Sequence, residues 1–324
     1  MKRDQSYQIF WETFNVPSKL KEIIPKILSE DEANILSYLS DKKVTSSDIF
    51  LRFPYLPADI LKSSFEKGYI IRHEEGDEKF YTSCSLEGII KRFIIHSSTL
   101  NELTQKDMSI IQKYITSGAL KEMKESKKPV YRVLPIDVTI EDKRQLVPFY
   151  QAKSYIQQSS KVAVVNCLCR ATYRNCDKPL KVCLSLNQKA EFFIDRKIGE
   201  EIDVKQALEV LDIARQHDLI HSINNVENPE YLCNCCECCC VYIQGLKKFG
   251  IFTSIGKSAF AAKILNELCD MCGLCIEKCP FGAFSLENET MVIDEEKCFG
   301  CGLCSYHCPQ SAIQLIMKKQ DDLL

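Results

Sequence analysis

Cysteine is the residue whose number and spacing most clearly predict chemistry in this chain. Of 324 residues, 19 are cysteines, and all of these except Cys84 lie after residue 166. Clustered cysteines in a cytosolic chain indicate metal ligation, because thiols stay reduced there. Disulfides between neighbours such as Cys238, Cys239 and Cys240 are also disfavoured, since the bridge needs a defined separation of the Cβ atoms. The sequence therefore predicts metal sites.

The clearest cysteine pattern occurs twice near the end of the chain. The run C-x2-C-x2-C-x3-C-P begins at Cys269 and is repeated from Cys298, 29 residues later. Two-residue spacers let three thiolates reach three corners of one iron–sulfur cube, and the fourth cysteine ligates the other cube. We expect one [4Fe–4S] cluster on Cys269, Cys272, Cys275 and Cys308. We expect the second on Cys298, Cys301, Cys304 and Cys279.

The residues around these motifs fit the same chemistry. Gly273 and Gly302 lie inside the two loops, where the backbone must approach inorganic sulfide closely. A hairpin is expected between residues 283 and 294. With its two cysteine motifs, the segment 258–317 resembles the bacterial two-cluster ferredoxin family. The resemblance implies a fast one-electron relay at low potential, and we assign residues 258–324 to this two-cluster domain.

A second field of cysteines precedes the two motifs. It comprises Cys167, Cys169, Cys176, Cys183, Cys233, Cys235, Cys236, Cys238, Cys239 and Cys240. These ten thiols are two more than two further four-cysteine sites require. Adjacent cysteines in an extended chain point to opposite sides, so one run can serve two sites or bridge metals within one cluster.

Three interpretations of this second field are open. One or more additional iron–sulfur clusters are favoured, because soft thiolate ligands suit them. The alternatives are structural zinc held by four cysteines and thiols without metal. Arg170, directly after Cys169, can offset thiolate charge or donate to sulfide, or else form a surface ion pair. We leave His217 and His221 out of the ligand set and expect Cys84 to be a small buried hydrophobe.

The cysteine-rich field belongs to a predicted middle domain, residues 129–257. Strands are expected near 130–134, 162–165 and 219–223. Helices are expected near 148–158 and, after an N-cap at Asp203, to about residue 216. Strands that alternate with helices indicate an α/β domain.

The first 128 residues are predicted to be mainly helical, with a winged-helix-like domain at about 29–83. Ser29 and Glu32 form a capping box before a helix at 33–39. Helices near 45–53 and 57–68 and a hairpin of 69–72 with 79–82 follow, an order typical of this helix-turn-helix variant.

This predicted domain lacks the charge of a DNA reader. Residues 31–80 hold seven Lys or Arg against ten Asp or Glu, and the wing tip is itself acidic. Duplex DNA is bound through a basic footprint. We therefore expect docking onto a partner protein or packing within the chain, rather than DNA binding.

Composition predicts an ordinary globular protein, with 45% hydrophobic and 27% charged residues. The net charge of −2 gives no general attraction to nucleic acid or anionic membranes. No apolar run approaches the length of a membrane span, and the first residues lack a secretory signal. We expect a cytoplasmic protein, and the sequence does not predict its oligomeric state.

The whole chain also resembles a group of iron–sulfur proteins found in anaerobic bacteria and archaea. The resemblance rests on the winged-helix-like front, the CxCR at 167–170, Cys176 and Cys183, the NCCECCC run at 234–240, and the ferredoxin end. It implies one shared architecture and no particular substrate. The expected fold class is α+β multidomain.

The leading functional hypothesis is an electron-transfer protein. It would relay single low-potential electrons through two [4Fe–4S] clusters, between a redox partner protein and a further metal centre in the middle domain. The alternatives are a reductase subunit whose middle cysteine site reduces a substrate, and a redox-responsive winged-helix regulator. No Rossmann fingerprint, Walker loop or Ser–His–Asp pattern occurs. No catalytic residue is therefore predicted, and a non-catalytic carrier or an oxidoreductase subunit is favoured.

Overall fold

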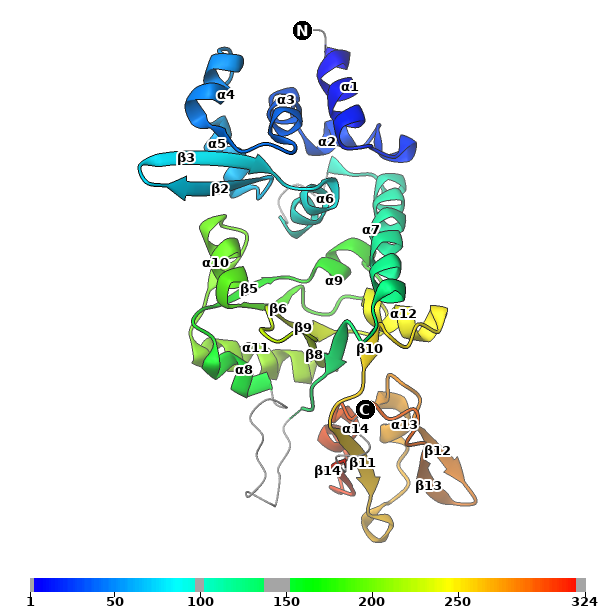
Figure 1. The fold of residues 1–324 in the computed structure, drawn as a ribbon. Coiled ribbons are helices and arrows are strands. Elements are labelled where there is room, and N and C mark those ends of the chain that lie inside the picture. Colours follow the sequence, from blue (N-terminus) through cyan, green and yellow to red (C-terminus); the bar gives the residue numbers. More distant parts are fainter. Residues whose placement is uncertain (1–2, 97–101, 137–151, 319–324) are drawn as a thin grey trace. The chain divides into compact units, whose positions relative to one another are not determined.

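The computed structural model describes residues 3–96, 102–136 and 152–318 (Figure 1). The chain folds into two compact units. The first comprises Met1–Gly118, Ala171–Tyr173 and Phe192–Glu200, and the second comprises Ala119–Arg170, Arg174–Glu191 and Glu201–Leu324. The division into three domains at residues 128 and 257 stays a prediction. Among the helices of the described residues, none is long and apolar enough to cross a membrane.

The first unit begins with three helices, α1 (Arg3–Thr13), α2 (Ile24–Ile27) and α3 (Glu30–Leu39). The hydroxyl of Ser29 accepts a hydrogen bond from the Glu32 N–H, and the Glu32 carboxylate accepts one from the Ser29 N–H. This reciprocal arrangement satisfies two N–H groups that the first turn of α3 leaves free. The predicted capping box is confirmed.

Two short helices and a three-stranded sheet complete the region of the predicted winged helix. The elements are β1 (Val44–Thr45), α4 (Ser46–Arg52), α5 (Ile60–Glu66), β2 (Ile70–Glu75) and β3 (Glu78–Ser83). β2 and β3 form the expected antiparallel hairpin, and β1 pairs with the other edge of β3. The order of elements is the one expected, and the winged-helix assignment itself stays a prediction. Cys84, which follows β3, is buried as predicted.

Two more helices, α6 (Leu86–Ile95) and α7 (Gln105–Glu125), follow this sheet. The hydroxyl of Ser85 caps α6 by accepting a hydrogen bond from the Gly88 N–H. The buried side of α6 carries Ile89, Ile90, Phe93 and Ile94. The helical stretch expected after the hairpin is therefore present.

The second unit is built on a seven-stranded sheet of order β10-β4-β8-β9-β6-β5-β7. Its strands are β4 (Tyr131–Val133), β5 (Val162–Asn166), β6 (Lys181–Leu186), β7 (Glu200–Glu201), β8 (Ile220–Asn224), β9 (Tyr231–Cys235) and β10 (Ile255–Gly256). The pairs β4–β8, β8–β9, β9–β6 and β6–β5 are antiparallel, and β10–β4 is parallel. The structure as a whole is a mixture of helices and largely antiparallel sheet.

One face of this sheet is covered by α8 (Ala152–Gln158) and α11 (Val204–Gln216) (Figure 1). Buried residues of both helices pack against side chains of β5, β6 and β9, such as Val164, Leu184 and Leu232. α11 starts with the predicted cap, since the Asp203 side chain accepts the Gln206 N–H. The start of the helix predicted at 148–158 lies outside the described residues.

The opposite face of the sheet carries cysteines. Successive side chains on a strand point to opposite faces. Leu184 and Leu232 face α8 and α11, so their strand neighbours Cys183, Cys233 and Cys235 face the other way. Two further helices begin directly after cysteines, α9 (Leu168–Tyr173) after Cys167 and α12 (Val241–Phe249) after Cys240. α10 (Asn187–Asp195) follows β6.

The C-terminal module repeats a helix and a strand. Its elements are β11 (Phe260–Ile264), α13 (Leu274–Lys278), β12 (Phe284–Glu287), β13 (Thr290–Ile293), α14 (Leu303–His307) and β14 (Ile313–Met317). β12 and β13 form the predicted hairpin. β11 pairs antiparallel with β14, so the two ends of the module are joined in one ribbon.

The module is packed against the cysteine-bearing face of the sheet. The Ile136 N–H donates a hydrogen bond to the Cys301 carbonyl, at 2.9 Å. Phe299 and Leu303 lie in one buried cluster with Ile220 of β8 and Ile243 of α12. The loop of the second cysteine motif is therefore part of the core of this unit.

Asp218, in the turn between α11 and β8, also holds the module. Its carboxylate accepts a hydrogen bond from Lys278 Nζ at 2.9 Å and lies 2.6 Å from His307 Nε2. Lys278 and His307 are the last residues of α13 and α14, directly before Cys279 and Cys308. One carboxylate thus joins both short helices of the module to the sheet.

Candidate metal centres

Two cavities in the C-terminal module are lined by cysteines. The cysteines around the first are Cys269, Cys272, Cys275 and Cys308. Those around the second are Cys279, Cys298, Cys301 and Cys304. These are the two sets expected from the sequence, with the fourth cysteine of each motif in the cavity of the other motif.

The sulfur atoms of the module fit iron–sulfur clusters better than single ions. Backbone N–H groups of Ala283 and Ala312 donate to the thiols of Cys279 and Cys308, at 3.3 and 3.2 Å. Such hydrogen bonds favour charged sulfur and tune cluster potentials. No three of the module's eight thiols lie within 4.8 Å of one another, although all of them belong to the described residues. The spacing of the thiols therefore suits a body wider than one ion.

The two cavities differ in their exposure to solvent. Cys298, Cys301 and Cys304 are all buried, whereas Cys272 of the first cavity is exposed. Burial raises the pKa of Cys301 to about 12. The second cavity is therefore the more buried of the two, although its Cys279 is half-buried, and the first lies at the surface of the module.

Gly300 is a position that the sequence analysis missed. Its φ is +64°, in the left-handed region, and a Cβ there would overlap the Phe260 carbonyl and the Ser258 hydroxyl. Gly273 and Gly302, which were singled out from the sequence, also have positive φ. Gly300 differs from these two glycines in its neighbour, because the backbone of β11 lies directly against the loop of the second motif at this position.

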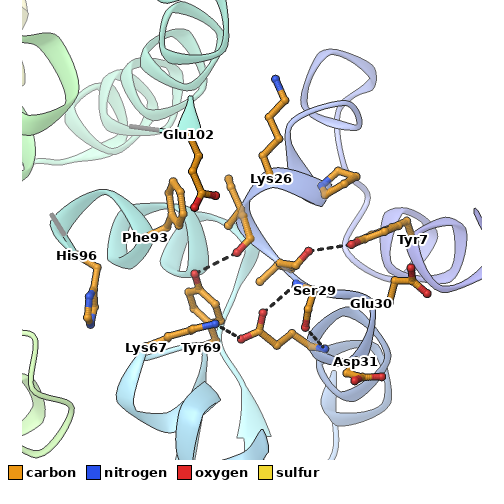
Figure 2. Close-up of a pocket in the computed structure, with 14 residues that line it drawn as sticks. Tyr7, Lys26, Ser29, Glu30, Asp31, Lys67, Tyr69, Phe93, His96 and Glu102 are labelled. Atoms are coloured by element: carbon orange, nitrogen blue, oxygen red, sulfur yellow. Dashed lines mark hydrogen bonds and ion pairs between the residues drawn. The ribbon is translucent and has the colours of Figure 1, made fainter. Parts of the chain in front are cut away.

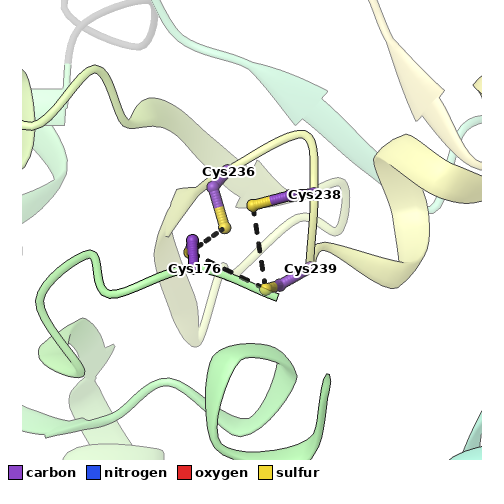
Figure 3. A group of neighbouring side chains, drawn as sticks. All are labelled: Cys176, Cys236, Cys238 and Cys239. Atoms are coloured by element: carbon purple, nitrogen blue, oxygen red, sulfur yellow. Dashed lines mark hydrogen bonds between the residues drawn. The ribbon is translucent and has the colours of Figure 1, made fainter. Parts of the chain in front are cut away.

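The ten cysteines of the middle field separate into two groups. The first, which we call the four-thiol group, consists of Cys176, Cys236, Cys238 and Cys239 (Figure 3). Its four Sγ atoms lie within 4.8 Å of one another. The Sγ of Cys176 is 3.9 Å from that of Cys236 and 3.8 Å from that of Cys239. A tetrahedron with zinc–sulfur bonds of about 2.3 Å has sulfur–sulfur edges of about 3.8 Å. The group can therefore hold one metal ion.

Donors around the four-thiol group support bound thiolates. The backbone N–H of Lys178 reaches the Cys176 thiol and that of Asn175 reaches the Cys239 thiol. Burial raises the pKa of Cys236 to about 12, although a hydrogen bond from Arg170 opposes this rise. Metal binding must then displace a proton from Cys236, so metal affinity falls as the pH is lowered.

The other six thiols, which we call the six-thiol ring, come from one face of the sheet and from the N-terminal ends of α9 and α12. They influence one another's pKa in the order Cys167, Cys169, Cys240, Cys235, Cys233 and Cys183, and Cys183 influences Cys167 again. Interactions with Cys169 and Cys183 lower the pKa of Cys167, and interactions with Cys233 and Cys240 lower the pKa of Cys235. Each thiol thus interacts with two others.

Neighbours in the sequence are divided between the two groups. Cys235 is in the ring and Cys236 in the four-thiol group, and Cys239 and Cys240 are divided in the same way. The register of β6 and β9, with Leu184 opposite Leu232, brings Cys183 beside Cys233. One run of cysteines therefore serves two sites, which is one of the possibilities that the sequence left open.

Arg170 lies between the two thiol groups. Its side chain is buried, with 3% exposure, so the surface ion pair considered from the sequence is wrong. Nε donates to the Pro179 carbonyl, and Nη1 donates to the Asn234 carbonyl and to the Cys236 thiol. Nη2 is buried and has no hydrogen-bond partner among the described residues. The guanidinium is thus placed to offset thiolate charge.

The two histidines near the cysteines have other positions. His221 Nδ1 lies 2.6 Å from Asn234 Oδ1 in the buried part of the sheet. His217 is the C-cap residue of α11. Neither is among the side chains of the four-thiol group.

The first unit contains a cavity of about 700 Å³ (Figure 2). Its described lining includes no cysteine, and two of its charged groups pair with each other, Lys67 Nζ with the Glu32 carboxylate at 2.7 Å. The hydroxyls of Tyr7 and Tyr69 donate to the carbonyls of Leu28 and Ile27. These contacts stabilise the turn before α3 and do not resemble a metal centre.

We expect Gly300→Ala to lose the metal of the second cavity while keeping that of the first. The added methyl must displace β11 or the cysteine loop, in addition to the strain of a positive φ. Gly250→Ala is the matched control, because Gly250 has φ +63° and open space around its Cβ position. Iron per chain, measured after anaerobic reconstitution, should fall by about four in Gly300→Ala only. Equal iron in the two variants would contradict the role given to this contact.

We expect the double variant Cys176→Ser/Cys239→Ser to lose one metal ion per chain without losing acid-labile sulfide. The four-thiol group has the dimensions of a site for a single ion, and a single ion needs no sulfide. Metal and sulfide analysis of the purified protein measures both quantities, with Cys84→Ser as the control. Loss of sulfide together with the metal would show that the group holds a cluster.

Comparison with known families bears on the C-terminal module. Residues 268–312 match the family model of the 4Fe-4S dicluster domain. No curated protein and no solved structure matches the chain. The family match covers both cysteine motifs described above and none of the middle field. It supports a C-terminal ferredoxin-like module that binds 4Fe–4S clusters.

Proposed function

We propose that the protein relays single low-potential electrons between a redox partner and the cysteine-rich sheet. In this proposal the eight cysteines of the two motifs hold two [4Fe–4S] clusters, in the crosswise sets that line the two cavities. The clusters, when bound, supply the one-electron chemistry. The chain's own residues decide where electrons enter and leave.

One observation carries the proposal. Phe299, Cys301 and Leu303 line the second cavity, and they also belong to the buried cluster that contains Cys235 and Cys240 of the six-thiol ring. The same side chains therefore belong both to the lining of the second cavity and to the buried cluster that includes thiols of the sheet. Electron transfer slows steeply with distance and with intervening solvent, and shared buried packing favours transfer between the two sites.

The aromatic side chains at this junction are closely packed. The rings of Phe281 and Phe299 are stacked, with centroids 4.1 Å apart and an angle of 16° between their planes. Both residues line the second cavity. Their packing excludes water from the side of the cavity that faces the sheet.

The surface around the first cavity is suited to a partner protein. Cys272 is exposed, and so are the neighbouring apolar side chains of Leu268, Met271 and Ile276. Exposed apolar groups that cluster on a surface mark interaction sites. We infer that a redox partner docks there.

Asp218 keeps the module in place on the sheet. Although burial alone would raise the pKa of Asp218, hydrogen bonds from Lys278 and His307 hold it below the ordinary value of an aspartate. The carboxylate is therefore ionised at neutral pH, and its pairing is lost only when the pH falls through this lowered pKa. The two bonded residues come from different short helices, so the pairing fixes the orientation of the module.

We expect Asp218→Asn to slow the transfer of electrons from the module to the sheet by about tenfold, which corresponds to about 1.4 kcal/mol in the barrier. The amide keeps the size of the side chain and loses the charge that pairs with Lys278 and His307. Stopped-flow reduction with a one-electron donor measures the transfer as a second phase of bleaching. Iron and sulfide content should be unchanged.

Asp212→Asn is the control for this experiment. Asp212 is an exposed residue of α11 whose carboxylate pairs only locally, with Arg215 at 2.7 Å. Its replacement should leave both phases unaltered. A second phase that is equally fast in Asp218→Asn and in the unmodified protein would contradict the proposed route.

A further inference from the structure

We propose that the six-thiol ring binds one polynuclear iron–sulfur cluster that uses all six thiols. The ring consists of Cys167, Cys169, Cys183, Cys233, Cys235 and Cys240. This site is separate from the four-thiol group and from the two cavities of the ferredoxin-like module. Strand register places Cys183 beside Cys233 on one face of the sheet, Cys233, Cys235 and Cys240 share one cluster, and Cys167 and Cys240 are the N-cap residues of α9 and α12. This placement holds whatever the direction of electron flow.

The thiols of the ring are spaced too widely for all of them to bind one metal ion. No three of its thiols lie within 4.8 Å of one another, whereas all four Sγ atoms of the four-thiol group do. The ferredoxin-like module shows the same wide spacing around each of its cavities. Within one unit, the narrow group therefore has the dimensions of one tetrahedral ion, and the ring has those of a larger body.

The number of thiols points to a cluster larger than one cube. A four-iron cube takes four cysteine ligands, and the ring offers six. Each ring thiol lies close enough to two other ring thiols to influence their pKa, so no thiol of the ring stands apart from the rest. Sharing of thiols between metals, or a cluster of more than four irons, satisfies this arrangement.

Hydrogen-bond donors around the ring match those of the module. The backbone N–H of Arg170 reaches the Cys167 thiol, and that of Val241 reaches the Cys169 thiol. The Ser222 hydroxyl lies 3.3 Å from Cys235 Sγ. In the module, alanine N–H groups donate to cysteine sulfur in the same way. Donors of this kind stabilise the negative charge of a bound cluster.

Arg170 provides the positive charge that a buried anionic cluster needs. A buried charge is costly unless another group compensates it. The guanidinium interacts with the thiols of Cys167 and Cys183 and donates to Cys236. Its buried Nη2 has hydrogens that no described residue accepts. An iron–sulfur cluster in the ring would supply the acceptor.

Two tyrosines pack beside the ring. The aromatic rings of Tyr131 and Tyr242 have centroids 4.2 Å apart, and both tyrosines lie near the Cys233 thiol. Tyr131 is also part of the buried cluster that contains Cys235, Cys240 and Cys301. The ring is thus mostly buried, and its cluster extends to the second cavity of the module.

Metal and sulfide counts test the proposal. The unmodified protein, reconstituted anaerobically with iron and sulfide, should hold at least four irons and matching sulfide beyond the roughly eight of the module. Cys167→Ser/Cys235→Ser removes thiols on opposite sides of the ring and should return sulfide to about eight, with about eight irons besides any single ion in the four-thiol group. Cys176→Ser/Cys239→Ser should lose at most that single ion and retain the additional sulfide. Additional sulfide that survives in the ring variant, or ring metal without sulfide, would overturn the proposal.

Alkylation of the unmodified protein gives a second test, which does not depend on the folding of a variant. All six ring cysteines should resist iodoacetamide in the reconstituted protein and become reactive together when a chelator removes the additional iron. Mass spectrometry of the peptides reports each cysteine separately. Protection of only four ring cysteines would show a simple cube and contradict the use of all six.

We expect Arg170→Gln to shift the reduction potential of the additional centre to a more negative value. Removing a nearby positive charge makes the added electron less favourable. Arg170→Lys keeps the charge and should restore most of the potential, whereas a merely structural role would not distinguish the two variants by charge. A redox titration followed by electron paramagnetic resonance measures the shift. An unchanged potential in Arg170→Gln would overturn the electrostatic role of Arg170.

Discussion

The arrangement of thiols in the second unit depends on the position of β9 in its sheet. β9 lies between β8 and β6, so it is held on both edges by backbone hydrogen bonds. Because side chains alternate along β9, Leu232 packs in the core with α8 and α11, and Cys233 and Cys235 point to the opposite face. A slip of one residue would exchange these faces, bury the two thiols against α11 and break both thiol sites. The hydrophobic packing of Leu232 therefore also fixes the position of the metal ligands.

The same sheet produces sites of two different widths. The four-thiol group gathers residues of two tight loops, where the chain turns sharply enough to bring four sulfur atoms together. The ring draws its ligands from β6, β9 and the N-terminal ends of α9 and α12, which regular structure holds further apart. Secondary structure thus limits how closely thiols can approach, and this limit separates a site for one ion from a site for a cluster.

Much of the ferredoxin-like module could be predicted from the sequence, because the cysteines that define its ligand sets follow a local spacing pattern. Two-residue spacers, a fourth cysteine and a repeat after 29 residues define each set of ligands without knowledge of distant contacts. Gly300 could not be predicted as critical, since the atoms that exclude a side chain there belong to Phe260 and Ser258. The obstacle lies in a strand 40 residues away in the sequence.

The sorting of the middle cysteines could not be predicted for a related reason. Cys183 meets Cys233 only through the register of β6 and β9, and the sequence around Cys233 has no strand pattern that would reveal it. Alternation along an extended chain did predict that neighbours such as Cys235 and Cys236 can separate. It could not predict which distant thiol each would join. Likewise Arg170, beside a cysteine in the sequence, finds its partners at Pro179 and Asn234.

Burial favours the protonated thiol at these sites, whereas metal binding requires the thiolate, and the surrounding hydrogen-bond donors stabilise the thiolate. A neutral thiol behaves as a small hydrophobic group and is readily buried in a core. A metal ligand must instead be a thiolate, and burial disfavours this charged form. In the ring, the N–H groups of Arg170 and Val241 and the charge of the guanidinium stabilise thiolates without solvent. These donors are in place only after β5, β6 and β9 have paired, because they belong to the helices that follow the strands. The ring of donors and thiols is therefore complete only in the folded sheet, and bound metal would stabilise the sheet that assembles it.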